Sequence, residues 1–173
     1  MRLFFALWPS DEVRLAMAHA RLDVARRCGG RPPAPVTMHL TLAFVGDTDD
    51  SNLPDLMRIG GAIKAKPFML KIDTAHCFAK AQIAWIGSLA PPPAMFDLQE
   101  KLKTKLADAG FFIDPRAFRP HVTVSRHITG EFAPFHIPPI DWPVEAFQLV
   151  RSRLGQQGAS YETLATFPLS GKK

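Results

Sequence analysis

The chain lacks the features that mark membrane, disulfide-linked and metal-binding proteins. No uninterrupted apolar run reaches the ~18 residues of a transmembrane helix, so we expect no membrane contact. The two cysteines, Cys28 and Cys77, lie far apart and outside any CxxC pair, which favours free buried thiols in a reducing compartment, the cytoplasm. No histidines or cysteines have the spacing of a zinc site, so we expect no metal and no cofactor.

Long runs of like charge and a break in composition are also missing. The 173 residues are 47% hydrophobic and 21% charged, which is ordinary for a soluble globular protein. No segment has the composition of a linker, and we therefore expect one domain over residues 1–173. The formal net charge of +5 suits a partner that carries phosphate, although many basic proteins bind no nucleic acid.

Hydrophobic periodicity predicts helices and strands mixed along the chain. The N-terminal "RLFFALWP" reads as a first strand rather than a signal peptide, and Ser10 then caps a helix that "CGG" ends. Further helices are expected from about Asn52 and over 94–110. Strands are also expected around positions 39 and 121, over 68–78 and 81–90, and in a closing hairpin of 144–154 with 160–169. The proline-rich segment 131–143 is expected to be a loop. Adjacent strands mixed with helices favour an α+β fold with antiparallel sheets.

Two of the predicted strands carry the same polar pair. "HLTL" holds His39 and Thr41, and "HVTV" holds His121 and Thr123. Because residues two apart on a strand point the same way, each imidazole shares a face with its threonine, while the leucines or valines face the other side. Both strands follow a helix and a Gly/Pro loop, which predicts two pseudo-symmetric lobes. A third His-x-Thr at His127 lies beyond the expected strand end and lacks the apolar fourth residue, so we give it no role.

Two imidazoles and two hydroxyls that converge between such lobes suit the opening of a cyclic phosphodiester. The reaction needs a base to deprotonate water and an acid to protonate the leaving alkoxide, and imidazole, with a pKa of about 6.5, can do either. Threonine hydroxyls can donate hydrogen bonds to the non-bridging phosphate oxygens. A lone histidine in a strand is more often structural, but two matching apolar strands are harder to attribute to chance.

The paired motifs, together with "RLFFAL", "IAWIG" and "RPHVTVSR", resemble the two-histidine (2H) phosphoesterases. Within them, the chain is similar to the bacterial and archaeal RNA 2′,3′-cyclic phosphodiesterases, also called 2′-5′ RNA ligases, over almost its whole length. The resemblance implies a bilobal α+β fold with an antiparallel sheet in each lobe, flanking helices and an active-site cleft between the lobes. It also implies metal-independent hydrolysis of a 2′,3′-cyclic phosphate to a 2′-phosphomonoester, with 2′-5′ RNA ligation as a secondary reaction.

The resemblance assigns a role to each motif residue. It implies that His39 is the general acid, that His121 is the general base, and that Thr41 and Thr123 bind the phosphate, although the motifs do not exclude the reverse acid and base assignment. It further implies that the partners are RNA ends or small nucleotides with a 2′,3′-cyclic phosphate, bound by a monomer.

Two further residues match family positions near the site. Arg126 matches an arginine that binds phosphate, but strict alternation puts it on the face of Val122 and Val124, so it reaches the site only if the strand bends or ends near Ser125. Phe4 matches a position near the cleft and is a candidate to stack on a base.

The motifs recognise phosphate and not the base, so two alternatives stay open. One is a nucleotide- or RNA-binding module without useful turnover. The other is a phosphodiesterase for another cyclic or 2′-5′-linked nucleotide.

Overall fold

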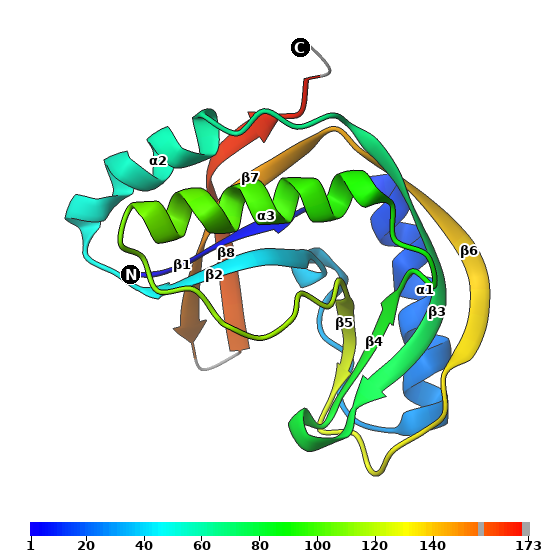
Figure 1. The fold of residues 1–173 in the computed structure, drawn as a ribbon. Helices are drawn as coiled ribbons and strands as arrows, with labels where there is room; N and C mark the ends of the chain where they lie inside the picture. The colour runs from blue at the N-terminus through cyan, green and yellow to red at the C-terminus, as the bar shows by residue number, and fades with distance from the viewer. Residues whose placement is uncertain (156–157, 171–173) are drawn as a thin grey trace.

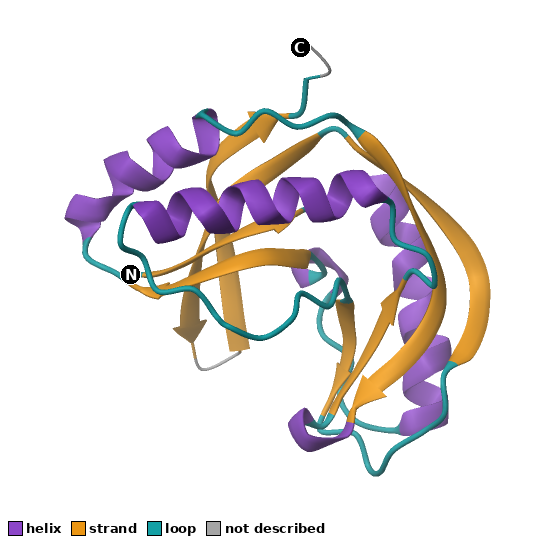
Figure 2. Cartoon of the chain, viewed as in Figure 1, coloured by secondary structure: helices purple, strands orange, loops and turns teal. Residues whose placement is uncertain are grey.

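The computed structural model describes residues 1–155 and 158–170. They form three α-helices and eight β-strands, joined by loops and three short 3-10 helices (Figures 1 and 2). In chain order the elements are β1 (Arg2–Leu7), α1 (Asp11–Cys28), η1 (Pro35–Thr37), β2 (Leu40–Asp47), η2 (Asp50–Asn52), α2 (Leu53–Gly61), β3 (Phe68–Phe78), η3 (Ala79–Ala81), β4 (Ile83–Gly87), α3 (Pro93–Asp108), β5 (Val122–Arg126), β6 (Phe135–Val144), β7 (Ala146–Gly155) and β8 (Gly158–Pro168).

The strands lie in the order β6-β3-β4-β5-β2-β1-β7-β8, and every neighbouring pair is antiparallel. At the centre, β2 and β5 are joined through a single residue pair, Leu40 with Val122. The sheet is therefore divided into two halves of four strands each. Counting outward from this junction, β2 corresponds to β5, β1 to β4, β7 to β3 and β8 to β6. This arrangement confirms the expected α+β fold with two pseudo-symmetric lobes.

The three helices are divided between the two lobes. Helices α2 and α3 pack over the lobe of β1, β2, β7 and β8, whereas α1 packs against β4, β5 and β6 of the other lobe (Figure 1). As expected, the Ser10 hydroxyl caps α1 by accepting a hydrogen bond from the Val13 N–H at 3.4 Å. One buried stripe on each long helix faces the core: Val13, Met17, Ala20 and Val24 on α1, and Met95, Leu98, Leu102 and Leu106 on α3. In the described part of the chain, no helix combines the length and apolarity needed to cross a membrane.

The proline-rich segment 131–143 was expected to be a loop, and this prediction is wrong for most of its length. Residues Phe135–Val144 form β6, which lies at one edge of the sheet and, among the described strands, pairs with β3 alone. Proline lacks an N–H and is tolerated on an edge strand, where one side makes no ladder hydrogen bonds. Pro138 and Pro139 fall within a register irregularity between Ile140 and His136. The edge position and the irregularity explain why a strand can accommodate these prolines.

Both cysteines are buried, and neither forms a disulfide.

Candidate active site

The two His-x-Thr motifs meet at the junction of the lobes. His39 directly precedes β2, and His121 directly precedes β5. The antiparallel pair of Leu40 with Val122 sets a register that places His39 opposite Thr123 and Thr41 opposite His121. Leu40 and Val122 are 1% and 0% exposed, so they fill the core on the opposite face. The four polar side chains therefore converge on one face of the sheet, as the motif pattern predicts.

Each imidazole is oriented by the backbone in the same way. His39 Nδ1 lies 2.7 Å from the Thr37 carbonyl oxygen, and His121 Nδ1 lies 2.6 Å from the Arg119 carbonyl oxygen. A carbonyl only accepts hydrogen bonds, so Nδ1 of each ring carries the proton and donates it. Nε2 is thereby left to accept or donate a proton at the site.

Both motif strands contain a one-residue bulge directly after the threonine. Opposite β1, the register shifts so that Leu42 of β2 has no partner, and opposite β4 it shifts so that Val124 of β5 has none. An extra residue in one strand of a pair interrupts the alternation of side chains and bends the strand. The two bulges lie at equivalent positions of the two motifs, which extends the pseudo-symmetry to this detail.

The bulge in β5 determines where Arg126 points. Val124 and Ser125 are consecutive and both fully buried, so strict alternation ends there. The bulge returns the exposed Arg126 to the face of Thr123 and His121. Its charge reaches both imidazoles, since it contributes to lowering the pKa of His39 and of His121. The condition under which Arg126 can reach the site, a strand irregularity near Ser125, is thus met.

Burial makes both imidazoles weak bases. For His39, burial lowers the pKa from 6.5 to about 4, against the opposing effect of the Thr37 hydrogen bond, and the charges of Arg126 and His121 lower it further. For His121, burial lowers the pKa, the Arg119 hydrogen bond opposes this effect, and the charge of Arg126 adds to it. Both rings are therefore neutral near pH 7 in the free protein. A bound phosphate anion would raise the pKa of both.

Aromatic rings enclose His39 on several sides. The indole of Trp8 lies parallel to the imidazole, with ring centroids 5.0 Å apart and an interplanar angle of 4°. The rings of Phe4 and Tyr161 also have their centroids 5.0 Å from it, Tyr161 in an edge-on orientation. Phe4 is 1% exposed, whereas Trp8 and Tyr161 are half-buried. Phe4 was expected near the cleft from the sequence, whereas Trp8 and Tyr161 were not. Nothing in the local pattern around Tyr161, which comes from β8, indicates that it lies beside His39.

The surroundings of His121 differ from those of His39. Phe78 meets its ring edge-on with centroids 4.9 Å apart, and Trp85 lies 6.1 Å away. Ala6 pairs with Thr41 as Trp85 pairs with Thr123, so the position equivalent to Trp8 in the second lobe is Gly87. His121 consequently has no stacked indole at the equivalent place. The two histidines share a backbone geometry but not an environment.

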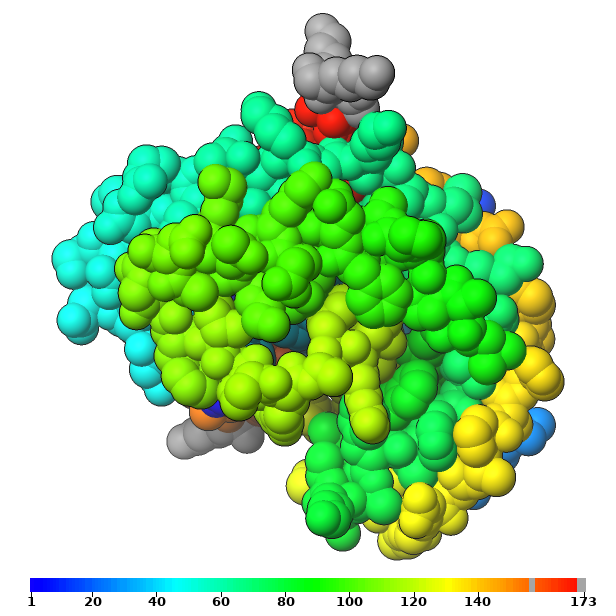
Figure 3. All heavy atoms as spheres, in the orientation of Figure 1, coloured from blue at the N-terminus to red at the C-terminus, as the bar shows by residue number. Residues whose placement is uncertain are grey.

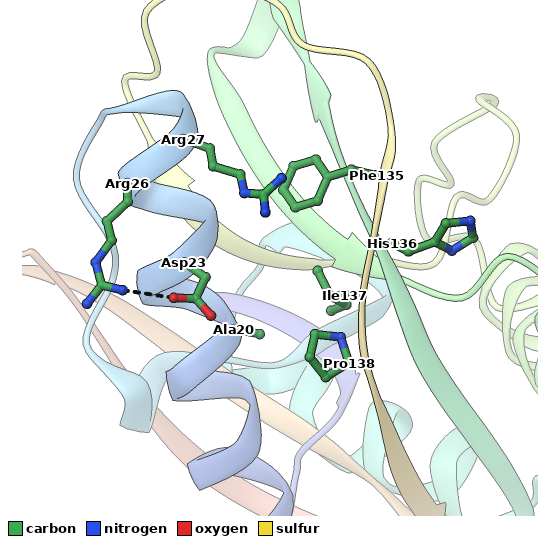
Figure 4. Close-up of a pocket in the computed structure, with 8 residues that line it drawn as sticks. All are labelled: Ala20, Asp23, Arg26, Arg27, Phe135, His136, Ile137 and Pro138. Carbon is green, nitrogen blue, oxygen red and sulfur yellow. Dashed lines mark hydrogen bonds and ion pairs between the residues drawn. The ribbon is translucent and has the colours of Figure 1, made fainter.

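Other polar groups lie away from this site. His127 follows β5 in a left-handed backbone conformation and is exposed. A shallow pocket of about 220 Å³ lies between α1 and β6, where Arg27 covers the ring of Phe135 at 4.4 Å and Arg26 pairs with Asp23 (Figure 4). None of the predicted site residues lines this pocket. Within residues 1–155 and 158–170, no group of three or more histidine, cysteine or acidic residues is arranged to hold a metal ion.

Comparisons with known proteins agree with this geometry. Residues 7–85 match the family model described as "LigT like Phosphoesterase". The chain is 30% identical over 171 residues to the RNA 2′,3′-cyclic phosphodiesterase of Escherichia coli K12, covering 98% of this chain and 97% of the relative. It is 32% identical over 190 residues to the Thermus thermophilus protein of the same name, covering 99% and 92%. The crystal structure of E. coli LigT complexed with 3′-AMP has the same fold, with a TM-score of 0.88 at 30% identity over 98% of both chains. The chain therefore belongs to the LigT-like phosphoesterases of the two-histidine superfamily.

Proposed function

We propose that this protein hydrolyses RNA 2′,3′-cyclic phosphates to 2′-phosphomonoesters without a metal ion, and that residues 1–173 act as one domain. The observation that carries the proposal is the junction of β2 and β5, where each histidine lies opposite the threonine of the other motif. The curated relatives, all named RNA 2′,3′-cyclic phosphodiesterase, support the same activity.

The reaction follows from the two free Nε2 atoms. His121, neutral, takes a proton from water, and the water oxygen attacks phosphorus. The bond from phosphorus to the 3′ oxygen breaks, and His39, protonated, gives its Nε2 proton to that oxygen. The product is a 2′-phosphate with a free 3′ hydroxyl. One proton enters the histidine pair and one leaves it, so the pair keeps its total charge through the step.

The remaining groups bind charge and hold the rings. The hydroxyls of Thr41 and Thr123 donate hydrogen bonds to the non-bridging oxygens, and the guanidinium of Arg126 balances the negative charge of the phosphate. Phe4, at 1% exposure, supports the His39 ring in this arrangement rather than offering a free face to a base. The more accessible rings beside His39 are those of Trp8 and Tyr161.

We further propose the substrates, the oligomeric state and the compartment of this enzyme. The substrates are RNA ends or small nucleotides with a 2′,3′-cyclic phosphate, bound by a monomer, with ligation as the minor direction because water is abundant. Two free buried thiols support a reducing compartment, the cytoplasm.

The test is turnover of 2′,3′-cyclic nucleotides in EDTA, with the 2′- and 3′-phosphate products separated by chromatography. We expect the 2′-phosphate, and His127→Ala as a matched control should retain full activity because this ring lies outside the site. Activity that is lost in EDTA and restored by a divalent ion would overturn the mechanism. Binding without turnover would favour the nucleotide-binding alternative, and a 3′-phosphate product would exchange the roles of His39 and His121.

A further inference from the structure

A second arginine lies directly beside Arg126. In the loop after α1, the N–H of Arg31 donates to the Arg126 carbonyl at 2.7 Å, and the N–H of Arg126 donates to the Arg31 carbonyl at 3.0 Å. These two bonds form an isolated antiparallel bridge on the edge of β5 that is not occupied by β4. Directly opposed residues of an antiparallel pair project to the same face, with Cα atoms ~5.5 Å apart when they exchange both hydrogen bonds. Arg31 therefore projects to the histidine face next to Arg126.

The loop is built for this close approach. Gly30 has a φ of +85°, and a Cβ atom there would lie 2.5 Å from the Arg126 carbonyl oxygen and 2.7 Å from the Ser125 hydroxyl oxygen. Only glycine fits such a position without moving the strand. The fully buried Ser125 donates a hydrogen bond to the Gly29 carbonyl at 2.9 Å. The same bulge that turns Arg126 outward turns Ser125 inward to hold the loop.

Both guanidinium groups are available to an anion. Arg31 and Arg126 are exposed, and within the described residues neither is within ion-pair distance of an acidic group. Most arginines elsewhere on the surface are paired, for example Arg58 with Asp55 on α2. The segment that leads from α3 to β5 is also at the surface (yellow-green in Figure 3), and its Arg119 is exposed just before His121.

We infer that Arg31 binds the phosphodiester that precedes the cyclic phosphate, so that the site prefers an oligonucleotide end to a mononucleotide. This inference rests on the proposed function and specifies its substrate class. The cyclic phosphate lies against the histidines with Arg126, and Arg31 extends the positive surface by one cross-strand spacing. A mononucleotide has no second phosphate for Arg31, whereas every RNA end has one. The planar guanidinium fork suits a phosphodiester with two free oxygens.

The test compares two substrates in two proteins. Initial rates are measured for a nucleoside 2′,3′-cyclic phosphate and for a dinucleotide with the same cyclic terminus, with wild type and with Arg31→Gln. The substitution should lower kcat/KM for the dinucleotide by about tenfold or more, mainly through KM, and leave the mononucleotide within about twofold. The dependence of dinucleotide kcat/KM on salt should also become weaker, because one fewer phosphate is neutralised. Arg58→Gln, on the remote α2, is the matched control for loss of one positive charge.

The outcomes separate this inference from the proposed function. The backbone bridge survives Arg31→Gln, and an unchanged thermal midpoint would verify that the fold is intact. Equal losses on both substrates, or no loss on either, would overturn the role of Arg31. If the wild type turned over neither substrate, the proposed function would fail. Calorimetric binding of a 2′-phosphorylated mononucleotide and of the corresponding dinucleotide would then test Arg31 by the same comparison without catalysis.

Discussion

Removing the indole of Trp8 should change the proton affinity of His39 and leave that of His121 unchanged. Trp8 covers one face of the His39 imidazole in parallel at 5.0 Å, and no equivalent ring covers His121 because Gly87 occupies that place. In Trp8→Ala, water can reach the exposed face of the imidazole. Since burial is the main cause that lowers the pKa of His39 to about 4, the pKa should rise from there toward 6.5.

Loss of the indole also has an effect that would lower the pKa of His39. An aromatic face attracts a cation by roughly 0.5–1 kcal/mol at an accessible site, so losing the indole also removes support for the protonated ring. This attraction energy corresponds to less than one pKa unit, because one unit equals about 1.36 kcal/mol. Burial is the largest cause of the shift from 6.5 to about 4, and Trp8 lies parallel to one face of the ring, while Phe4 and Tyr161 stay in place. We therefore expect relief from burial to exceed the lost attraction and the pKa to rise by part of this interval.

The assay is NMR titration of the imidazole Cε1–H signals, with His39 assigned from its absence in His39→Ala. Trp85→Ala is the matched control, because its indole lies beside His121 and should shift that titration instead. In turnover, Trp8→Ala should lower kcat by about tenfold or more, since His39 is the proposed general acid and its misplacement would be costly. A pKa of His39 that stays fixed or falls in Trp8→Ala would refute this reasoning.

The remaining predictions concern the histidine pair and the bulge. His39→Ala and His121→Ala should each lower kcat by ~10²-fold or more, and the double variant should lose far less than the product of the single losses; full additivity in single-turnover assays would contradict a shared step. Because both pKa values lie below 6.5, the singly protonated histidine pair should be most abundant at acidic pH, and kcat/KM should peak below pH 6.5. The maximum of kcat should lie at higher pH, because bound phosphate raises both pKa values. A single-limbed profile would contradict the pairing. Ser125→Ala removes the donor to the Gly29 carbonyl and should lower the free energy of unfolding by about 1 kcal/mol in urea titrations, and no change would show that water replaces that bond.

Local patterns predicted those parts of the molecule that depend on local physics. Helix α1 begins at the expected cap of Ser10, and β3 has the expected bounds of 68–78. The faces of the two motifs follow from the two-residue period of a strand. Strand β6 was missed because its prolines oppose a strand locally, and only the edge position in the assembled sheet removes the conflict.

Local sequence patterns also fail to predict the orientation of Arg126 at the candidate site. Alternation along β5 puts it on the wrong face, and the family resemblance puts it at the phosphate. The conflict is resolved by one unpaired residue, Val124, whose position depends on how β4 pairs with β5. Tyr161 lies beside His39 although β8 is far from the motif in the sequence, since in the described sheet β7 lies between β8 and β1. Such contacts depend on long-range register, which a single sequence does not specify.

In the proposed reaction, the two motifs move protons in opposite directions although their backbones are nearly equivalent. Each ring donates Nδ1–H to a carbonyl two residues earlier, and each strand has a bulge after its threonine, so these shared features cannot decide which ring is the acid. The difference must come from groups that break the symmetry. One such difference is Trp8 in the first lobe against Gly87 in the second. Another is Phe44 against Arg126, which are equivalent because each lies five positions after its motif histidine. The charge of Arg126 lowers the pKa of both imidazoles, whereas the indole of Trp8 encloses only His39, whose pKa burial lowers to about 4. This one-sided burial gives the two imidazoles unequal proton affinities, which an acid and base pair requires.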